Sequence, residues 1–93
     1  MQAIAEAAGR ICPQFGRDPA VCIMQAYHIS RNGKAAARWN CWDLPGGHGD
    51  RSDVIAVVAR PVGAPEYLRP IKRSLSTFSG PDAAVRAWCR FVR

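Results

Sequence analysis

Cysteine and histidine side chains can form disulfides, ligate metals or act as nucleophile and base, and this chain has four cysteines and two histidines. The cysteines are Cys12, Cys22, Cys41 and Cys89. No two of them have the Cys-x2-Cys spacing of a zinc site, and neither His28 nor His48 adjoins such a pair. We therefore expect no metal site and no cofactor.

The even number of cysteines is compatible with two disulfides. Cys12 ends one helical pattern and Cys22 opens the next, so a bond between them would staple a helical hairpin. The second bond would then join Cys41 to Cys89. The alternative is four reduced thiols that pack in the core as small apolar groups.

Trp39 and Trp42 lie in a segment rich in glycine and proline, residues 39–50, which we call the tryptophan loop. Their rings could stack on sugars or nucleobases, or plug the space over the helices. His28 is a candidate acid or base because the charge of its side chain changes near neutral pH. Its surroundings are mostly apolar, which favours a place in the core or in the wall of a groove.

The chain is basic, with 13 Lys and Arg against 7 Asp and Glu and a net charge of +6. This charge favours anionic partners, and arginine suits two-point contacts with carboxylates or phosphates. The bases are spread from Arg10 to Arg93 without a dense run. A small nucleic-acid-binding protein that contacts phosphates through an arginine surface is therefore an alternative function.

Periodicity and turn signals predict one domain over residues 1–93, with the order α, α, loop, β, β, α. The expected elements are a helix at 2–12, a helix from Asp18-Pro19 to near 31–33, a short helical turn at 34–38, strands at 54–59 and 69–78, and a helix that starts at a capping box formed by Ser79 and Asp82. The second helix is apolar on most faces, so we expect it to be central and buried. The fold class is α+β, mainly helical.

Three segments of the sequence follow one another in the order found in a known family. The first segment has Gln25, Ala26, Ser30, Gly33 and Lys34 at the spacing of the motif Q-A-x-L-E-S-G-x-G-K. This is the central-helix motif of the glucosaminidase-type peptidoglycan hydrolases, which the segment resembles. These enzymes are the lysozyme-like family of autolysins and flagellar-rod enzymes. Residues 39–46 resemble the family's N-N-L-F-G-I-K-G loop, and residues 76–88 are similar to its F-R-x-Y-x-S-x-x-E-S-V-x-D-Y segment. The resemblance implies a small lysozyme-like domain with a two-stranded β lobe.

The family's general acid is the Glu of the central motif, and Ile29 stands in its place here. An aliphatic side chain cannot protonate a glycosidic oxygen. Glu66, beside Tyr67 in the hairpin turn, matches the family's second carboxylate, and Asp43 is a candidate partner for it. The chain also ends at Arg93, before the further helices that wall the family's groove. These departures favour a protein that is not an enzyme.

The resemblance thus implies a non-catalytic, degenerate hydrolase-like module that binds peptidoglycan or a protein partner at the cell wall, for example in a phage tail or cell-envelope component. The residual groove would be lined by Tyr27, Trp39, Asn40, Trp42 and Tyr67. An active peptidoglycan glycosidase with an unconventional acid is the other alternative. No stretch is apolar over the roughly 20 residues of a membrane span, and no secretory signal is visible, so an extracytoplasmic location would require another export route.

Overall fold

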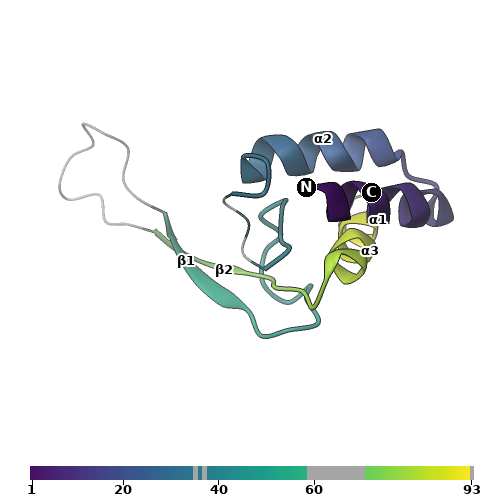
Figure 1. Cartoon of the computed structure of the whole chain (residues 1–93). Helices are drawn as coiled ribbons and strands as arrows, with labels where there is room; N and C mark the ends of the chain where they lie inside the picture. The colour runs from purple at the N-terminus through teal and green to yellow at the C-terminus, as the bar shows by residue number, and fades with distance from the viewer. Residues whose placement is uncertain (35, 37, 59–70, 93) are drawn as a thin grey trace.

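The computed structural model describes residues 1–34, 36, 38–58 and 71–92. The described elements are, in order, α1 (Gln2–Ile11), the 3-10 helix η1 (Cys12–Phe15), α2 (Pro19–Ser30), β1 (Val54–Val58), β2 (Ile71–Leu75) and α3 (Pro81–Phe91) (Figure 1). The predicted α+β class and order of elements are confirmed, with η1 added after α1. The expected helical turn at 34–38 and the hairpin turn that carries Glu66 and Tyr67 fall partly or wholly outside the described residues.

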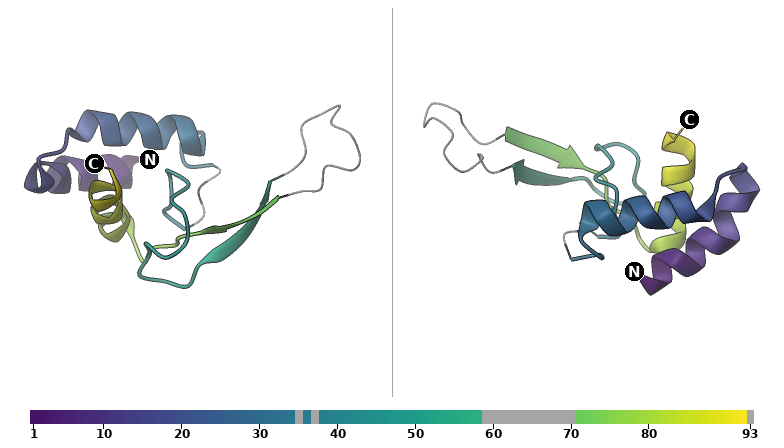
Figure 2. Two further views of the ribbon diagram at one scale, coloured as in Figure 1. Left: turned by 180° about the vertical axis from the view of Figure 1, so that it is seen from behind. Right: turned by 90° about the horizontal axis from the view of Figure 1, so that it is seen from above.

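The two strands pair antiparallel, with Val54 opposite Leu75 and Val58 opposite Ile71. They extend away from the three α-helices of the described chain (Figure 2). The tryptophan loop joins this sheet through Pro45, which forms a bridge with Leu75, and through Ser76, whose N–H donates to the carbonyl of Leu44 at 3.1 Å. The loop is therefore fixed between the strands and the helices.

Local signals set both ends of α2. The carboxylate of Asp18 accepts from the N–H of Ala20 at 2.9 Å, and Pro19 occupies the first helical position, where its missing N–H costs nothing. The helix ends at Ser30 and is capped by Arg31, which has a left-handed φ of 53°. Asn32 and Gly33 also have positive φ, so the left-handed turn continues through the residues at which the helix was predicted to end.

The start of α3 differs from the prediction. Its N-cap is Gly80 with no side-chain cap, so the capping box expected from Ser79 and Asp82 is wrong. The N–H and hydroxyl of Ser79 instead donate to the carboxylate of Asp50, at 2.8 and 2.5 Å. These bonds hold the pKa of Asp50 below its usual value. Ser79 therefore ties the tryptophan loop to the helix start, and Pro81 begins the helix.

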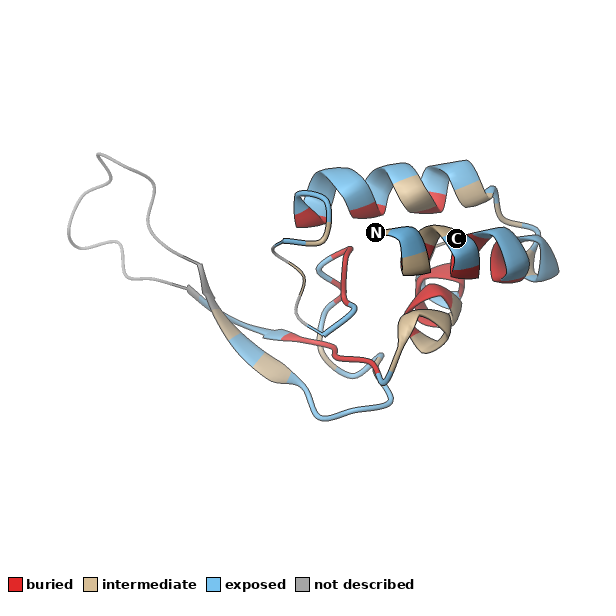
Figure 3. Cartoon of the chain, in the orientation of Figure 1, coloured by how far each residue is buried: buried red, intermediate tan, exposed pale blue. Residues whose placement is uncertain are grey.

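The core lies where α1 and α3 face each other and the tryptophan loop closes over them (Figure 3). The core-facing residues of the two helices are Ile4, Ala7, Ala8, Ile11, Ala84, Val85, Ala87, Trp88 and Cys89. Trp42 and Trp88 pack with ring centroids 6.3 Å apart. The Trp42 Nε1 donates to the carbonyl of Cys22 at 3.1 Å, so this indole is the plug over the helices.

The expectation that α2 is central and buried is wrong. Only a stripe of small side chains, Cys22, Ala26 and Ser30, is buried, at i, i+4 and i+8 on one face. Met24 and Tyr27 are exposed by 60% and 51%, and Figure 3 shows α2 along the outside of the molecule. Small side chains allow α2 to lie close to the core, while its larger apolar residues face outward. Within the part of the chain that the structure describes, no helix has the length and apolar character needed to cross a membrane.

Two glycines give opposite predictions for stability. A Cβ on Gly49 would collide with the carbonyl oxygen of Thr77 and lie 3.0 Å from its N, so Gly49→Ala should lower the free energy of unfolding by about 2–3 kcal/mol.

Gly9 is an exposed position in α1 with nothing within 4 Å of an added Cβ. Gly9→Ala should raise the free energy of unfolding by about 0.5–1 kcal/mol, because alanine favours the helix. Urea unfolding followed by circular dichroism measures both, and equal effects of the two substitutions would contradict this packing.

Candidate functional site

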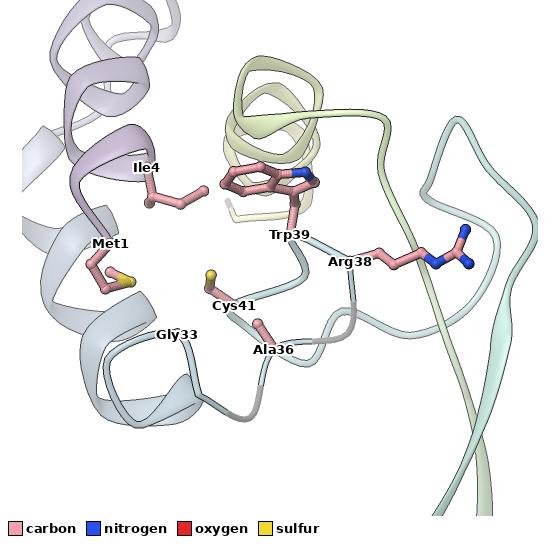
Figure 4. Close-up of a pocket in the computed structure, with 7 residues that line it drawn as sticks. All are labelled: Met1, Ile4, Gly33, Ala36, Arg38, Trp39 and Cys41. Carbon is pink, nitrogen blue, oxygen red and sulfur yellow. The ribbon is translucent and has the colours of Figure 1, made fainter.

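A pocket of about 260 Å³ opens between the start of α1, the turn after α2 and the segment that enters the tryptophan loop (Figure 4). We call it the Trp39 pocket. Its lining residues are Met1, Ile4, Gly33, Ala36, Arg38, Trp39 and Cys41. Most of the wall is apolar, and the polar groups are few, as is typical of ligand pockets.

The turn after α2 forms one wall of the pocket. The hydroxyl of Ser30 accepts from the N–H of Gly33 at 2.8 Å, and the N–H of Asn32 donates to the carbonyl of Tyr27 at 2.9 Å. These bonds cap the helix end and bring Gly33 beside Met1, whose side chain would lie 3.8 Å from a Cβ added at Gly33. The pocket wall is thus held by hydrogen bonds within the turn.

Arg38 and Trp39 have left-handed backbone conformations, with φ of 41° and 70°. Such conformations cost non-glycine residues of order 1–3 kcal/mol each and persist only where the surroundings hold them. Here the N–H of Phe78 donates to the carbonyl of Arg38 at 3.1 Å. The N–H of Cys41 donates to the carbonyl of Trp39 at 2.9 Å. As a result the Trp39 indole, 39% exposed, extends over the pocket toward Ile4, while the Arg38 side chain points the opposite way (Figure 4).

The thiol of Cys41 lies at the wall of the pocket and is 3% exposed. Burial raises its pKa, an effect partly offset by a hydrogen bond with Ser30 and by the N-terminal amine. The thiol is therefore neutral near pH 7 and a weak nucleophile. The pocket presents an indole face and aliphatic side chains, which are groups suited to binding, and the Arg38 guanidinium lies on the far side of the indole.

Of the four predicted groove residues that the structure describes, only Trp39 lines the pocket. The fifth, Tyr67, lies outside the described residues. Tyr27 is exposed on α2, where its ring meets His28 edge-on at 5.5 Å. Asn40 and Trp42 are 1% and 6% exposed, so the structure places them in the interior and corrects their assignment to a groove. Their polar atoms bond to backbone groups and hold the tryptophan loop in place.

The two candidate catalytic residues that the structure describes, His28 and Asp43, share no hydrogen bond or ion pair. His28 is exposed on α2, and Asp43 is exposed in the tryptophan loop with a left-handed φ of 52°. Glu66 lies outside the described residues. Ile29 is 43% exposed near the end of α2. No described residue that lines the Trp39 pocket is a carboxylate.

Asp53 and Asp82 have structural roles. Asp53 accepts from the N–H of Gly47 at 3.1 Å, and Asp82 pairs with Arg10 at 2.7 Å. The hydrogen bond from Arg10 lowers the pKa of Asp82. These carboxylates stabilise loops and helix contacts.

All four cysteines are free thiols in the structure, so neither predicted disulfide, Cys12–Cys22 or Cys41–Cys89, is formed there. The Sγ atoms of Cys12 and Cys89 are 3.8 Å apart, whereas a disulfide is about 2.05 Å long. Cys12, at the start of η1, contacts Cys89 of α3 and also interacts with Cys22 of α2. Burial raises the pKa of both Cys22 and Cys89.

Sequence reasoning missed most of the pocket. Arg38 directly precedes Trp39, but nothing in the spacing shows that Met1 and Ile4 of α1 approach these residues, since this depends on tertiary packing. Comparison of the chain with protein-family models, curated proteins and solved structures finds no match in any of the three.

Proposed function

We propose that this chain is a non-catalytic, lysozyme-like module that binds peptidoglycan at the cell wall through the Trp39 pocket. The observation that carries the proposal is the partly exposed indole of Trp39, held over an apolar pocket by two consecutive left-handed residues. An aromatic ring fixed in this way provides a flat surface for the apolar face of a sugar ring, at little further cost in conformational entropy.

Arg38 extends this surface beyond the pocket. Its guanidinium lies on the side away from the Trp39 indole, so a ligand that reaches both groups must be extended (Figure 4). Peptidoglycan has this form, with sugars along a strand and carboxylates on its peptide stems. Arginine binds carboxylates through charge-assisted, often two-point hydrogen bonds.

Two residues, Ile29 on α2 and Cys41 in the pocket, support binding over glycoside hydrolysis. Ile29 occupies the position at which the family resemblance would require the general acid, and its side chain cannot carry a proton. Cys41, which lines the pocket, has a raised pKa and so holds its proton at neutral pH. An active glycosidase therefore has less support than a binding module.

The nucleic-acid alternative depends on the distribution of the basic side chains. Lys72 and Arg73 are exposed on β2, but consecutive residues of a strand point to opposite faces of the sheet. These two side chains therefore do not form one basic surface. A DNA mobility shift in a series of salt concentrations tests the alternative, because phosphate contacts predict a steep fall of affinity with salt.

Trp39→Ala is expected to weaken binding to insoluble peptidoglycan at least about tenfold, or about 1.4 kcal/mol, because tryptophans often dominate the energy of binding sites. The measurement is a co-sedimentation isotherm with purified peptidoglycan. Ile55→Ala is the matched control, since Ile55 is an apolar side chain 65% exposed on β1, away from the pocket. Equal binding by the two variants, or retained DNA binding without peptidoglycan binding, would overturn the proposal.

A further inference from the structure

Three of the four cysteines lie on helices and are buried in the core. Cys12 begins η1, Cys22 is on the inner face of α2, and Cys89 is in the last turns of α3. Their exposures are 0%, 0% and 2%. The fourth, Cys41, lines the Trp39 pocket instead.

The thiols of Cys12 and Cys89 are in van der Waals contact, with their Sγ atoms 3.8 Å apart. The two residues are 77 positions apart in the sequence, so only the tertiary fold brings them together. A disulfide requires the two sulfurs to approach to about 2.05 Å, so the bond needs them to move less than about 2 Å closer than they already are.

Two further contacts join η1 and the residue segment after it to the end of α3 and the residue that follows it. The guanidinium of Arg17 donates to the carbonyl of Val92, and the guanidinium of Arg90 lies 5.9 Å from the centre of the Phe15 ring. Cys12 precedes Phe15 and Arg17, while Cys89 precedes Arg90 and Val92, so the same two segments meet at three places. The backbone around the thiols is therefore held close by contacts that do not depend on the sulfurs.

We propose that Cys12 and Cys89 form a disulfide when the chain folds in the presence of a low-molecular-weight disulfide. One of the two thiolates attacks a sulfur of the reagent, which forms a mixed disulfide and releases one reagent thiol. The other thiolate then displaces the second reagent thiol and completes the Cys12–Cys89 bond. The two cysteines lose two protons and two electrons in total, and the reagent disulfide is reduced to two thiols.

This pairing differs from both disulfides expected from the sequence, and it does not depend on the proposed function. Cys22 remains a free thiol on α2, and Cys41 remains one at the pocket. The bond closes a loop of nearly the whole chain, from η1 to α3. A long loop removes more conformational freedom from the unfolded chain than the short loop of a Cys12–Cys22 bond would remove.

The test is to refold the full chain from denaturant with oxidised and reduced glutathione, block free thiols, and digest with trypsin. Cleavage after arginine places each cysteine in its own peptide, namely residues 11–17, 18–31, 39–51 and 87–90. We expect 11–17 to be linked to 87–90, and the other two peptides to carry blocked thiols. The oxidised chain should melt more than about 10 °C above the reduced chain.

Cys89→Ser should abolish both the linked peptide and the gain in melting temperature, whereas Cys41→Ser should retain both. A link between 11–17 and 18–31, a link between 39–51 and 87–90, or no link at all would overturn the proposal. The peptide map of the unsubstituted chain decides the result even if a serine variant folds poorly. Loss of peptidoglycan binding in Trp39→Ala would still be measured separately, so the two proposals fail independently.

Discussion

Trp88→Ala is expected to lower the free energy of unfolding by about 3–5 kcal/mol, as is typical when a buried tryptophan is truncated. Trp88 is 2% exposed and packs against Trp42, and its Nε1 donates to the Gln25 side chain at 3.1 Å. A domain of this size has a total stability of about 5–14 kcal/mol, toward the lower end for a small core. The variant should therefore be partly unfolded at 37 °C.

Urea unfolding followed by far-ultraviolet circular dichroism measures this effect. Trp88→Phe is the matched variant, because it keeps an aromatic ring in the core and removes the bond to Gln25, whose side chain is exposed. We expect it to cost about 1–2 kcal/mol. Met24→Ala, at an exposed position, should change stability by less than about 0.5 kcal/mol. A cost for Trp88→Ala as small as that of Met24→Ala would show that Trp88 is not in the core.

Asn40→Ala is expected to lower the free energy of unfolding by about 3 kcal/mol, because it removes three hydrogen bonds and leaves the N–H of Leu44 and the carbonyl of Ser76 without the partner that Asn40 gives them. The Asn40 Nδ2 donates to the carbonyls of Leu44 and Ser76, each at 2.9 Å, and its Oδ1 accepts from the N–H of Leu44 at 2.9 Å. The side chain is 1% exposed, so water cannot replace these bonds. It joins the tryptophan loop to the segment that follows β2.

Asn40→Asp provides a sharper test of the same network. The substitution keeps the size of the side chain but places a carboxylate oxygen against the carbonyls of Leu44 and Ser76, which raises the pKa of the new acid in the folded state. Its protonated form can donate one hydrogen bond, so the variant should be less destabilised at pH 4 than at pH 7 relative to the parent chain. Equal destabilisation at both pH values would contradict this hydrogen-bond pattern.

The element order was predictable because its signals are local. Asp18 and Pro19 mark the start of α2, and the branched run from Val54 marks β1 without reference to the rest of the chain. The burial of α2 was not predictable from its composition, because a helix that is apolar on most faces has no periodicity to show which face is inside. The small side chains of Cys22 and Ala26 determine it, through the close approach they allow.

The site was predictable only in part. Trp39 and Trp42 are three residues apart in one loop, and the sequence treats them alike. They separate because the Trp42 Nε1 reaches the carbonyl of Cys22 in the core, while the left-handed backbone at Trp39 turns its ring toward the pocket. Both effects depend on contacts with distant segments, as does the bond from Phe78 that fixes Arg38.

The place of Met1 in the wall of the Trp39 pocket has a practical consequence for protein production. Any group joined to its amino nitrogen starts beside Gly33 and Cys41, at the surface that we propose binds a sugar. An N-terminal affinity tag would therefore compete with the ligand or mimic one. A tag attached after residue 93 begins beyond α3, and none of the described residues of α3 lines the pocket. This position is therefore the better choice for a tag in binding measurements.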